Sequence, residues 1–244
     1  MSARATLATA RRVLTQLRRD PRTLVLLLAV PPLLLFLLRH VFAGNEARFD
    51  RVAGTLIGLF PFVTMFIVAS ITILRERTTG TLERLMTLPL AKADLLVGYG
   101  LAFALVATAQ ALVAAGVALG GLGLDVAGPV WLVLVFAVAN AILGMALGLF
   151  LSAFARSEFQ AVQFMPAFVL PQILLCGLFV PRDRMAGWLE AVSDALPLTY
   201  AYDALARAVS DDLDSRLALD AAAITGVALL ALALGAATLR RRTA

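Results

Sequence analysis

The sequence predicts an all-α membrane protein with six transmembrane helices and with both chain ends in the cytoplasm. Hydrophobic residues make up 61% of the 244 residues and charged residues 15%, whereas soluble domains are about 45–50% apolar. The mean hydropathy is +0.91. The apolar residues form runs of about 20, the length of a membrane-spanning helix, rather than the alternating segments of about ten residues that a transmembrane barrel needs.

The chain divides into a short N-terminal helix, residues 1–22, and a single transmembrane domain, residues 23–244. Leu7, Ala10 and Leu14 recur every three or four residues and so share one face of a helix. Arginines lie on the neighbouring arcs, which favours a helix that rests on an anionic membrane surface. A solvated cytoplasmic helix and a cleaved signal peptide are the alternatives.

Six apolar runs predict the six spans, at residues 23–42, 52–74, 95–119, 129–154, 160–180 and 219–239. Pro31 and Pro32 are expected to kink the first span and Pro61 the second, because proline lacks the N–H group that a helix bonds. Gly144 and Gly148 lie four residues apart in the fourth span. This spacing of small residues allows another helix to approach closely.

Lysine and arginine residues orient the spans. The side of the membrane that holds both chain ends collects 14 of them and the opposite side collects seven. Because cytoplasmic loops carry the excess of positive charge, the chain ends are predicted to be cytoplasmic. The polar segment 75–90 is then cytoplasmic as well, and the acidic segment 181–216 is extracellular.

The sequence offers little chemistry of its own. His40 is the single histidine, and no cluster of His, Cys and carboxylate residues has metal-ligand spacing. No charged residue lies in the middle of a span, which argues against an ion-coupled drug carrier. A membrane-embedded enzyme acting on lipids would need a carboxylate or histidine cluster. No phosphate-binding loop is present, so ATP binding by this chain is not expected.

The net charge of +5 suits the cytoplasmic arginines of a membrane protein better than nucleic-acid binding.

The segment 75–90, RERTTGTLERLMTLPL, is expected to receive mechanical work from another protein. Its middle can form about two turns of helix in which Leu82, Leu85 and Met86 share one face, and Pro89 ends the helix. A helix this short is not stable alone, which favours a partner that buries its apolar face. A plain amphipathic loop on the bilayer surface is the alternative.

The sequence of this segment resembles the signature of ABC-2 type transporter permeases, through Glu76-x3-Gly80-Thr81-Leu82-Glu83-x-Leu85-x3-Pro89. The later strings EFQAVQFMP (158–166), PQ (171–172), GLFVP (177–181) and LPLTY (196–200) are similar to one branch of that family. That branch includes daunorubicin-type drug-efflux and nodulation-factor export permeases. The resemblance covers essentially the whole chain.

The resemblance implies the transmembrane permease subunit of an exporter in a bacterial plasma membrane. Such a subunit moves a hydrophobic or amphipathic compound, such as a drug, a polyketide or a glycolipid, out of the cytoplasm or the inner leaflet by alternating access. Its implied partners are membrane lipids, a second identical or homologous permease, and two copies of a separate ATP-binding subunit. ATP and Mg²⁺ would be bound by that subunit, and this chain would hold no cofactor, metal or catalytic residue.

The resemblance also implies a coupling helix that docks on the ATP-binding subunit. Its candidate residues are Arg75, Glu76, Arg77, Gly80, Thr81, Leu82, Glu83, Arg84, Leu85, Met86 and Pro89. The N-terminal helix would touch the same subunit, and short extracellular helices at 185–192 and 201–209 would dip back toward the membrane. An uncharged cargo cavity is expected from aromatic, methionine and amide side chains of spans two and five: Phe60, Phe62, Met65, Phe66, Gln163, Phe164, Phe168 and Gln172.

Overall fold

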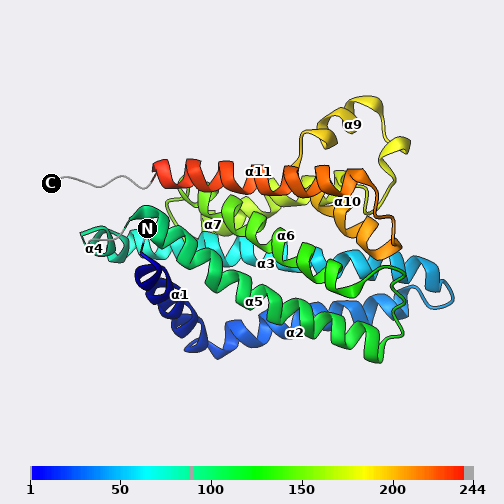
Figure 1. The fold of residues 1–244 in the computed structure, drawn as a ribbon, viewed down its shortest axis with the longest axis horizontal. Coiled ribbons are helices and arrows are strands. Elements are labelled where there is room, and N and C mark those ends of the chain that lie inside the picture. The colour runs from blue at the N-terminus through cyan, green and yellow to red at the C-terminus, as the bar shows by residue number, and fades with distance from the viewer. Residues whose placement is uncertain (1, 88–90, 239–244) are drawn as a thin grey trace.

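The computed structural model describes residues 2–87 and 91–238 and shows a bundle of long helices (Figure 1). The side chains of Leu82, Glu83, Met86 and Lys92 lie outside the described part. All regular structure in these ranges is helical. The elements are α1 (Ala3–Arg18), α2 (Pro21–Val41), α3 (Glu46–Thr78), α4 (Thr81–Thr87), α5 (Lys92–Gly121), α6 (Val130–Ser152), α7 (Glu158–Phe164), η1 (Met165–Val169), α8 (Leu170–Leu175), η2 (Arg182–Arg184), α9 (Gly187–Asp194), α10 (Pro197–Ser210) and α11 (Ser215–Thr238).

Five of these helices, α2, α3, α5, α6 and α11, are long and apolar enough to cross a membrane. They correspond to five of the six predicted spans. Figure 1 shows them lying side by side along one direction, with α1 and α4 at one end of the bundle and α9 at the other. These two ends are called the α1 end and the α9 end below.

The remaining predicted span, residues 160–180, is not one continuous α-helix. The chain passes from α7 through the π-helical turn η1 into α8, which ends at Leu175. Pro166 lies in η1 and Pro171 in α8. Because proline has no N–H group for the helix ladder, and π-turns are local insertions in helices, the two prolines explain the interruption. Gly177 then turns the chain with a φ of 104°.

Helix α3 is longer than its predicted span. It has 33 residues, which corresponds to about 50 Å, against a hydrocarbon core of about 30 Å. The first four residues of the polar segment, Arg75 to Thr78, therefore continue α3 instead of forming a loop. Gly80, at a φ of 70°, makes the turn that separates α3 from the short helix α4.

Helices α3 and α6 pack against each other through glycine. A Cβ atom built on Gly144 would lie 2.2 Å from the carbonyl oxygen of Phe62, and one on Gly148 would lie 2.3 Å from that of Phe66. The predicted close contact at Gly144 and Gly148 is thus confirmed, and its partner is α3. The two backbones touch along a full turn because neither glycine has a side chain between them.

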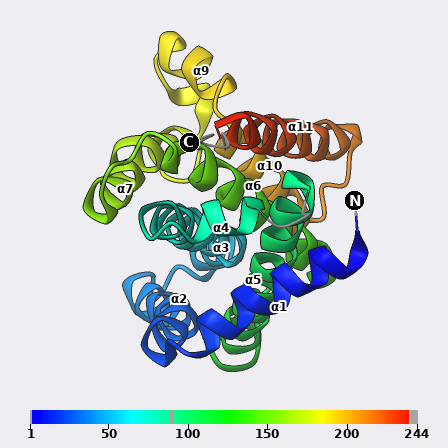
Figure 2. The same ribbon diagram turned by 90° about the vertical axis from the view of Figure 1, so that its left-hand side faces the viewer.

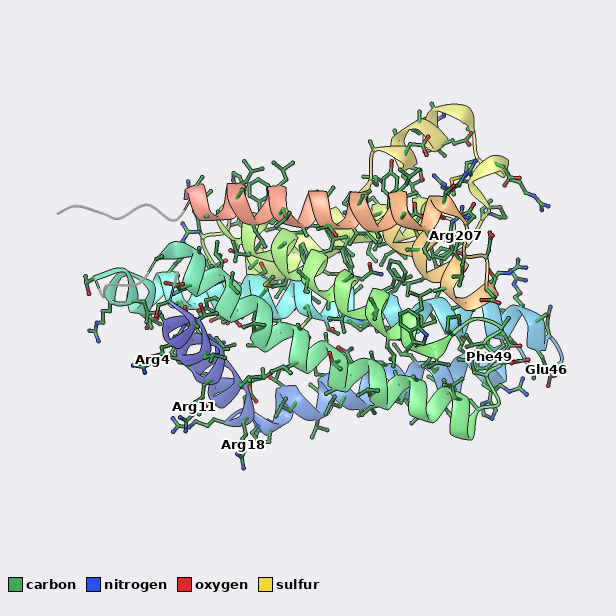
Figure 3. The ribbon with its side chains drawn as sticks, in the orientation of Figure 1. Arg4, Arg11, Arg18, Glu46, Phe49 and Arg207 are labelled. Atoms are coloured by element: carbon green, nitrogen blue, oxygen red, sulfur yellow. The ribbon has the colours of Figure 1, made fainter. Side chains whose placement is uncertain are left out.

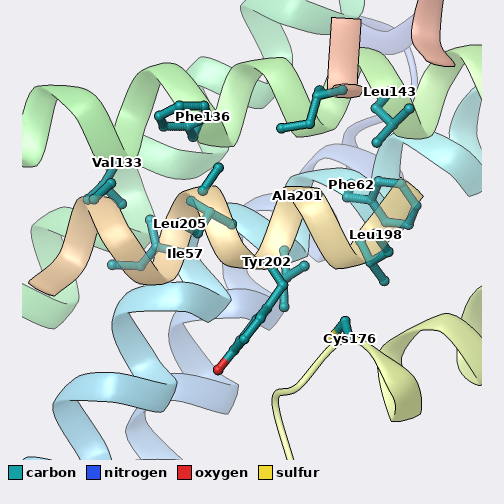
Figure 4. Close-up of a cluster of buried hydrophobic side chains, with 14 of the residues drawn as sticks. Ile57, Phe62, Val133, Phe136, Leu143, Cys176, Leu198, Ala201, Tyr202 and Leu205 are labelled. Atoms are coloured by element: carbon teal, nitrogen blue, oxygen red, sulfur yellow. The ribbon is translucent and has the colours of Figure 1, made fainter. Parts of the chain in front are cut away.

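Helix α10 lies inside the bundle against α3, α6 and α11, although it belongs to the segment between the last two spans. Leu198, Ala201 and Leu205 are fully buried there (Figure 4). Asn140 of α6 donates a hydrogen bond from its side-chain nitrogen to the carbonyl oxygen of Ala201, at 3.3 Å. Helix α9, by contrast, stands away from the bundle (Figure 1), and its Trp188 is 70% exposed.

Helix α1 crosses the end of the bundle (Figure 2). Its buried face includes Ala10 and Val13 and packs against α5, where a Cβ atom on Gly98 would meet the side chain of Thr9 at 2.6 Å. Part of the face predicted to lie on lipid is therefore covered by the protein itself, whereas Leu7 is exposed. Arg4, Arg11 and Arg18 point away from the bundle (Figure 3).

Candidate functional site

Three polar side chains from three helices meet at the α1 end. Arg12 of α1 donates from Nη1 to Oε1 of Glu76 at 2.7 Å, and from Nη2 to the hydroxyl oxygen of Tyr99 at 2.9 Å. The Tyr99 hydroxyl donates in turn to Oε2 of Glu76. The three residues connect α1, the end of α3 and the start of α5.

This junction is largely shielded from solvent. Glu76 is 5% exposed and Tyr99 is fully buried, while the side chain of Arg12 keeps 26% of its surface. A buried carboxylate is tolerated when its oxygens are hydrogen-bonded and a cation lies beside it. Here both carboxylate oxygens of Glu76 have a partner, so the charge pair fixes α1 against the end of α3.

Two further arginines hold the end of α3 against its neighbours. Arg75 donates from Nε and Nη2 to the two carboxylate oxygens of Glu158 in α7, at 3.0 and 3.2 Å. The hydrogen bond from Arg75 lowers the pKa of Glu158 below its ordinary value. Arg77 donates from Nη1 to the carbonyl oxygen of Ser152, at the last turn of α6, at 3.2 Å. The end of α3 therefore contacts α1, α5, α6 and α7.

Helix α4 follows directly from this junction. Leu85 is partly buried and packs against the hydrophobic cluster that α1, α2, α3, α5 and α6 share, whereas Arg84 is exposed. The Thr81 hydroxyl lies 3.0 Å from that of Thr79 across the turn. Of the other predicted coupling residues, Leu82, Glu83 and Met86 have side chains outside the described part, and Pro89 lies outside the described residues altogether.

The predicted coupling residues therefore occupy different environments. Arg75 and Arg84 are exposed, Arg77 and Leu85 are partly buried, and Glu76 faces inward. The sequence motif thus combines residues that face outward with one that holds the helix junction together.

Four of the eight predicted cargo residues are buried. Phe62, Met65 and Phe66 are 0% exposed and belong to the packed helix core. Gln172 is buried as well: its Nε2 donates to the carbonyl oxygen of Phe168 at 3.1 Å, and its Oε1 accepts from the N–H group of Leu198 at 3.4 Å. The amide of Gln172 therefore serves the contact between α8 and α10.

The other four cargo residues reach the surface of the single chain. Phe60 and Phe164 are partly buried, and Gln163 and Phe168 are exposed along α7 and η1. A cavity of about 390 Å³ opens at the α1 end, lined among others by Val13, Leu17, Ile71, Phe103 and Glu158. None of the eight predicted residues lines that cavity.

Several polar residues of the interior carry no signal in the local sequence pattern. Arg12 looks like the other arginines of α1, and Tyr99 is one hydroxyl in an apolar run. Gln110 accepts a hydrogen bond from the Thr64 hydroxyl at 2.9 Å between α5 and α3, and Asn140 holds α10. An amide or hydroxyl inside an apolar span is the available signal, since such groups seek partners on other helices. Within residues 2–87 and 91–238, no group of His, Cys, Asp or Glu residues is arranged to hold a metal ion.

Comparison with known proteins points to one family. The family model for the ABC-2 type transporter matches residues 4–209. The chain is 29% identical over 155 residues to a protein of Escherichia coli strain K12 named "Probable multidrug ABC transporter permease YbhR". It is 26% identical over 166 residues to ABC transporter G family member 20 of Dictyostelium discoideum.

The matches cover most of this chain but only part of those proteins. The aligned region is 62% of this chain and 41% of YbhR, and 68% of this chain and 23% of the Dictyostelium protein. The family match, in contrast, includes every element from α1 to α10. With well over half of its length matched in this way, the chain belongs to the ABC-2 type transporter family.

Proposed function

We propose that this chain is the transmembrane subunit of an ABC exporter, driven by ATP hydrolysis on a separate subunit. Its cargo is a hydrophobic or amphipathic compound. The family membership supports a permease role, and the relative in E. coli is named as a multidrug permease. ATP and Mg²⁺ bind to the partner ATPase in this proposal, and this chain transmits its movement to the membrane helices.

The junction at the α1 end is the observation that carries the proposal. A seven-residue helix, α4, follows a helix end that contacts α1, α5, α6 and α7. A force applied to α4 reaches four helices at once, because packed and hydrogen-bonded elements move as rigid bodies. An isolated helix of this length is unstable, so its attachment to the junction gives it a fixed position.

Alternating access in this proposal involves two permease chains that face each other. The segment α7–η1–α8 acts as the sixth span, which brings the count to six and places both chain ends in the cytoplasm. Exposed residues of this segment, Gln163 and Phe168, together with the partly buried Phe60 and Phe164, then line the cargo path between the two chains. Phe62, Met65 and Phe66 support that surface from behind, since they lie in the core.

The proposal is tested by reversing the exposed charge of α4. Arg84→Glu keeps the packing of Leu85, because Arg84 is exposed, but places an acidic group on the surface that would meet the ATPase. We expect this variant to lose co-purification with a co-expressed ABC ATP-binding subunit, and to lose ATP-dependent uptake of a hydrophobic dye into inverted membrane vesicles. The vesicles are assayed with and without vanadate.

Arg156→Glu is the matched control, because Arg156 is also exposed and lies in the turn between α6 and α7 at the same end. It should keep both co-purification and dye uptake. If Arg84→Glu kept both properties as well, the assignment of α4 as the docking element would be wrong. ATP hydrolysis by this chain purified alone would contradict the division of labour between the two subunits.

A further inference from the structure

A cavity at the α9 end is formed by three segments that are far apart in the sequence. Its volume is about 610 Å³, and its walls come from the first turns of α3, from the turn after α8 and from α10. Arg48 and Arg51 lie on α3, Arg182 begins η2, and Asp203 lies on α10. The cavity is separate from the junction at the α1 end.

The charges of this cavity are unbalanced. Its lining holds three arginines and one carboxylate, that of Asp203. Arg182 donates from Nη1 to Asp194 and from Nη2 to Asp203, each at 2.7 Å. Burial raises the pKa of Asp203 above its ordinary value, and Arg182 opposes that shift. The paired carboxylates thus fix the guanidinium group of Arg182 at the cavity wall.

Arg48 and Arg51 have no such carboxylate. They are three residues apart on α3 and so lie on one face, and neither forms an ion pair with any residue that the structure describes. Arg48 rests on the ring of Phe42, 5.5 Å from its centroid. Arg51 also borders a neighbouring cavity of about 450 Å³, whose aspartates include Asp50 and Asp125. Of these, Asp50 accepts the backbone N–H of Asp125 at 3.1 Å.

Apart from Asn45 at the start of α3, the uncharged part of the wall is mainly apolar. Val52, Leu178 and Phe179 line the cavity beside the arginines, and Tyr202 adds its ring. The turn at Gly177, with its φ of 104°, brings Leu178 and Phe179 to this position. Phe179 is 61% exposed in the single chain. Cationic and apolar surfaces therefore meet within one cavity.

We propose that this cavity binds an amphiphile through its anionic head group. The oxyanion, a phosphate, sulfate or carboxylate, is held by Arg48 and Arg51, since guanidinium groups bind such oxygens in a bidentate manner. Arg182, which is already paired with Asp194 and Asp203, forms the wall beside them. The adjoining chain lies against Val52, Leu178 and Phe179. Two sources offer this chemistry: a two-chain membrane lipid and a free single-chain amphiphile. The site is independent of export, because it requires neither ATP nor a partner subunit.

The test measures binding to the full chain purified in dodecyl maltoside, a neutral detergent. Octyl phosphate, below its micelle concentration, is expected to raise the melting temperature in a saturable way. In the variant Arg48→Gln/Arg51→Gln the apparent affinity should fall about tenfold or more, because hydrogen bonds to a charged group are lost. The control Arg184→Gln/Arg216→Gln removes the same charge from exposed positions outside the cavity and should bind like the parent.

Further arms separate the sources. A higher melting temperature with dioleoyl phosphatidylglycerol but not with octyl phosphate identifies a membrane lipid as the occupant. A higher melting temperature with both compounds shows that a free single-chain amphiphile is also accepted. Either result supports the proposal. The variant Arg48→Lys/Arg51→Lys keeps the positive charge but lacks the planar guanidinium group that can bind an oxyanion through two parallel hydrogen bonds. It should bind more weakly than the parent but better than the glutamine variant. This graded order would not be expected if the glutamine variant lost binding only because it folds poorly.

Three results would overturn the proposal. They are a shift with an anionic amphiphile that is equal in the parent and the glutamine variant, an equal shift with inorganic phosphate or with octyl trimethylammonium at the same concentration, and no shift with either anionic amphiphile. None of these measurements involves transport or an ATPase. A negative binding result would therefore rule out the amphiphile site without affecting the export proposal, which is tested separately by the α4 variants.

Discussion

Glu76 shows how a single residue of a motif can differ in role from its neighbours. The sequence places it in a run of charged residues and predicts contact with a partner protein. In the structure Glu76 is 5% exposed, and its carboxylate binds Arg12 and Tyr99. A lone buried carboxylate would be costly, so the three side chains depend on one another. Glu76 is a positioning residue for α3 and, through it, for α4.

We expect Glu76→Gln to lower the free energy of unfolding by about 2 kcal/mol, since the amide oxygen can still accept from Arg12 but no longer neutralises its charge at the buried junction. Arg75→Gln is the comparison, because it removes a pair whose two side chains are 61% and 52% exposed, and should cost less than about 1 kcal/mol. Unfolding in detergent micelles, followed by circular dichroism, measures both. Equal losses in the two variants would contradict the importance given to the buried junction.

At the scale of elements, glycine decides which helices touch. Gly144 and Gly148 bring α6 onto α3, and Gly54 and Gly58 of α3 leave room for Val209 and Leu205 of α10, whose side chains would lie within 2.9 Å of an added Cβ atom. In a bilayer, close packing replaces much of the hydrophobic driving force between helices. Helix α3 therefore packs against α6 at two glycines of α6, and against α10 at two glycines of its own.

Gly144→Ala should destabilise the bundle by about 2 kcal/mol, because the added methyl group meets a backbone oxygen at 2.2 Å and α3 has to move. Gly116→Ala on α5 is the control: nothing lies within 4 Å of its Cβ position. Alanine should stabilise that helix by about 0.5 kcal/mol. Resistance to unfolding by sodium dodecyl sulfate ranks the three proteins. A Gly144→Ala chain as stable as the parent would rule out the close contact with α3.

At the scale of the whole molecule, the two ends of the bundle are chemically different. The α1 end carries the junction of Arg12, Glu76 and Tyr99 and the short helix α4. The α9 end carries η2, α9 and the cavity with three arginines. The proposed function requires the α1 end to face the ATPase in the cytoplasm and the α9 end to lie on the opposite side of the membrane.

Cysteine labelling tests this orientation. Asp183→Cys, in an exposed position of η2, should react with a membrane-impermeant maleimide in intact cells. Arg156→Cys, at the α1 end, should react only after lysis. The native Cys176 is fully buried, so the parent chain provides a low background. Labelling of Arg156→Cys alone in intact cells would reverse the predicted topology.

The sequence by itself determined the helical class, five apolar helices, the place of a short helix after α3 and the close-packing glycines of α6. These follow from signals within one segment: apolar run length, proline and glycine positions, and the spacing of residues on one helix face. The interruption of 160–180 could have been anticipated in part, because Pro166 and Pro171 lie within it, but the π-turn depends on how neighbouring helices accept the freed backbone groups.

Only the tertiary structure decided which polar residues meet. Arg12 lies 64 positions from Glu76 and 87 from Tyr99, and no periodicity within a segment indicates that they share one site. The helices that α10 packs against, α3, α6 and α11, and the arginine-lined cavity at the α9 end likewise depend on segments from opposite halves of the chain. Local patterns report the face that a helix will bury, whereas the neighbour that covers this face is chosen by packing of the whole bundle.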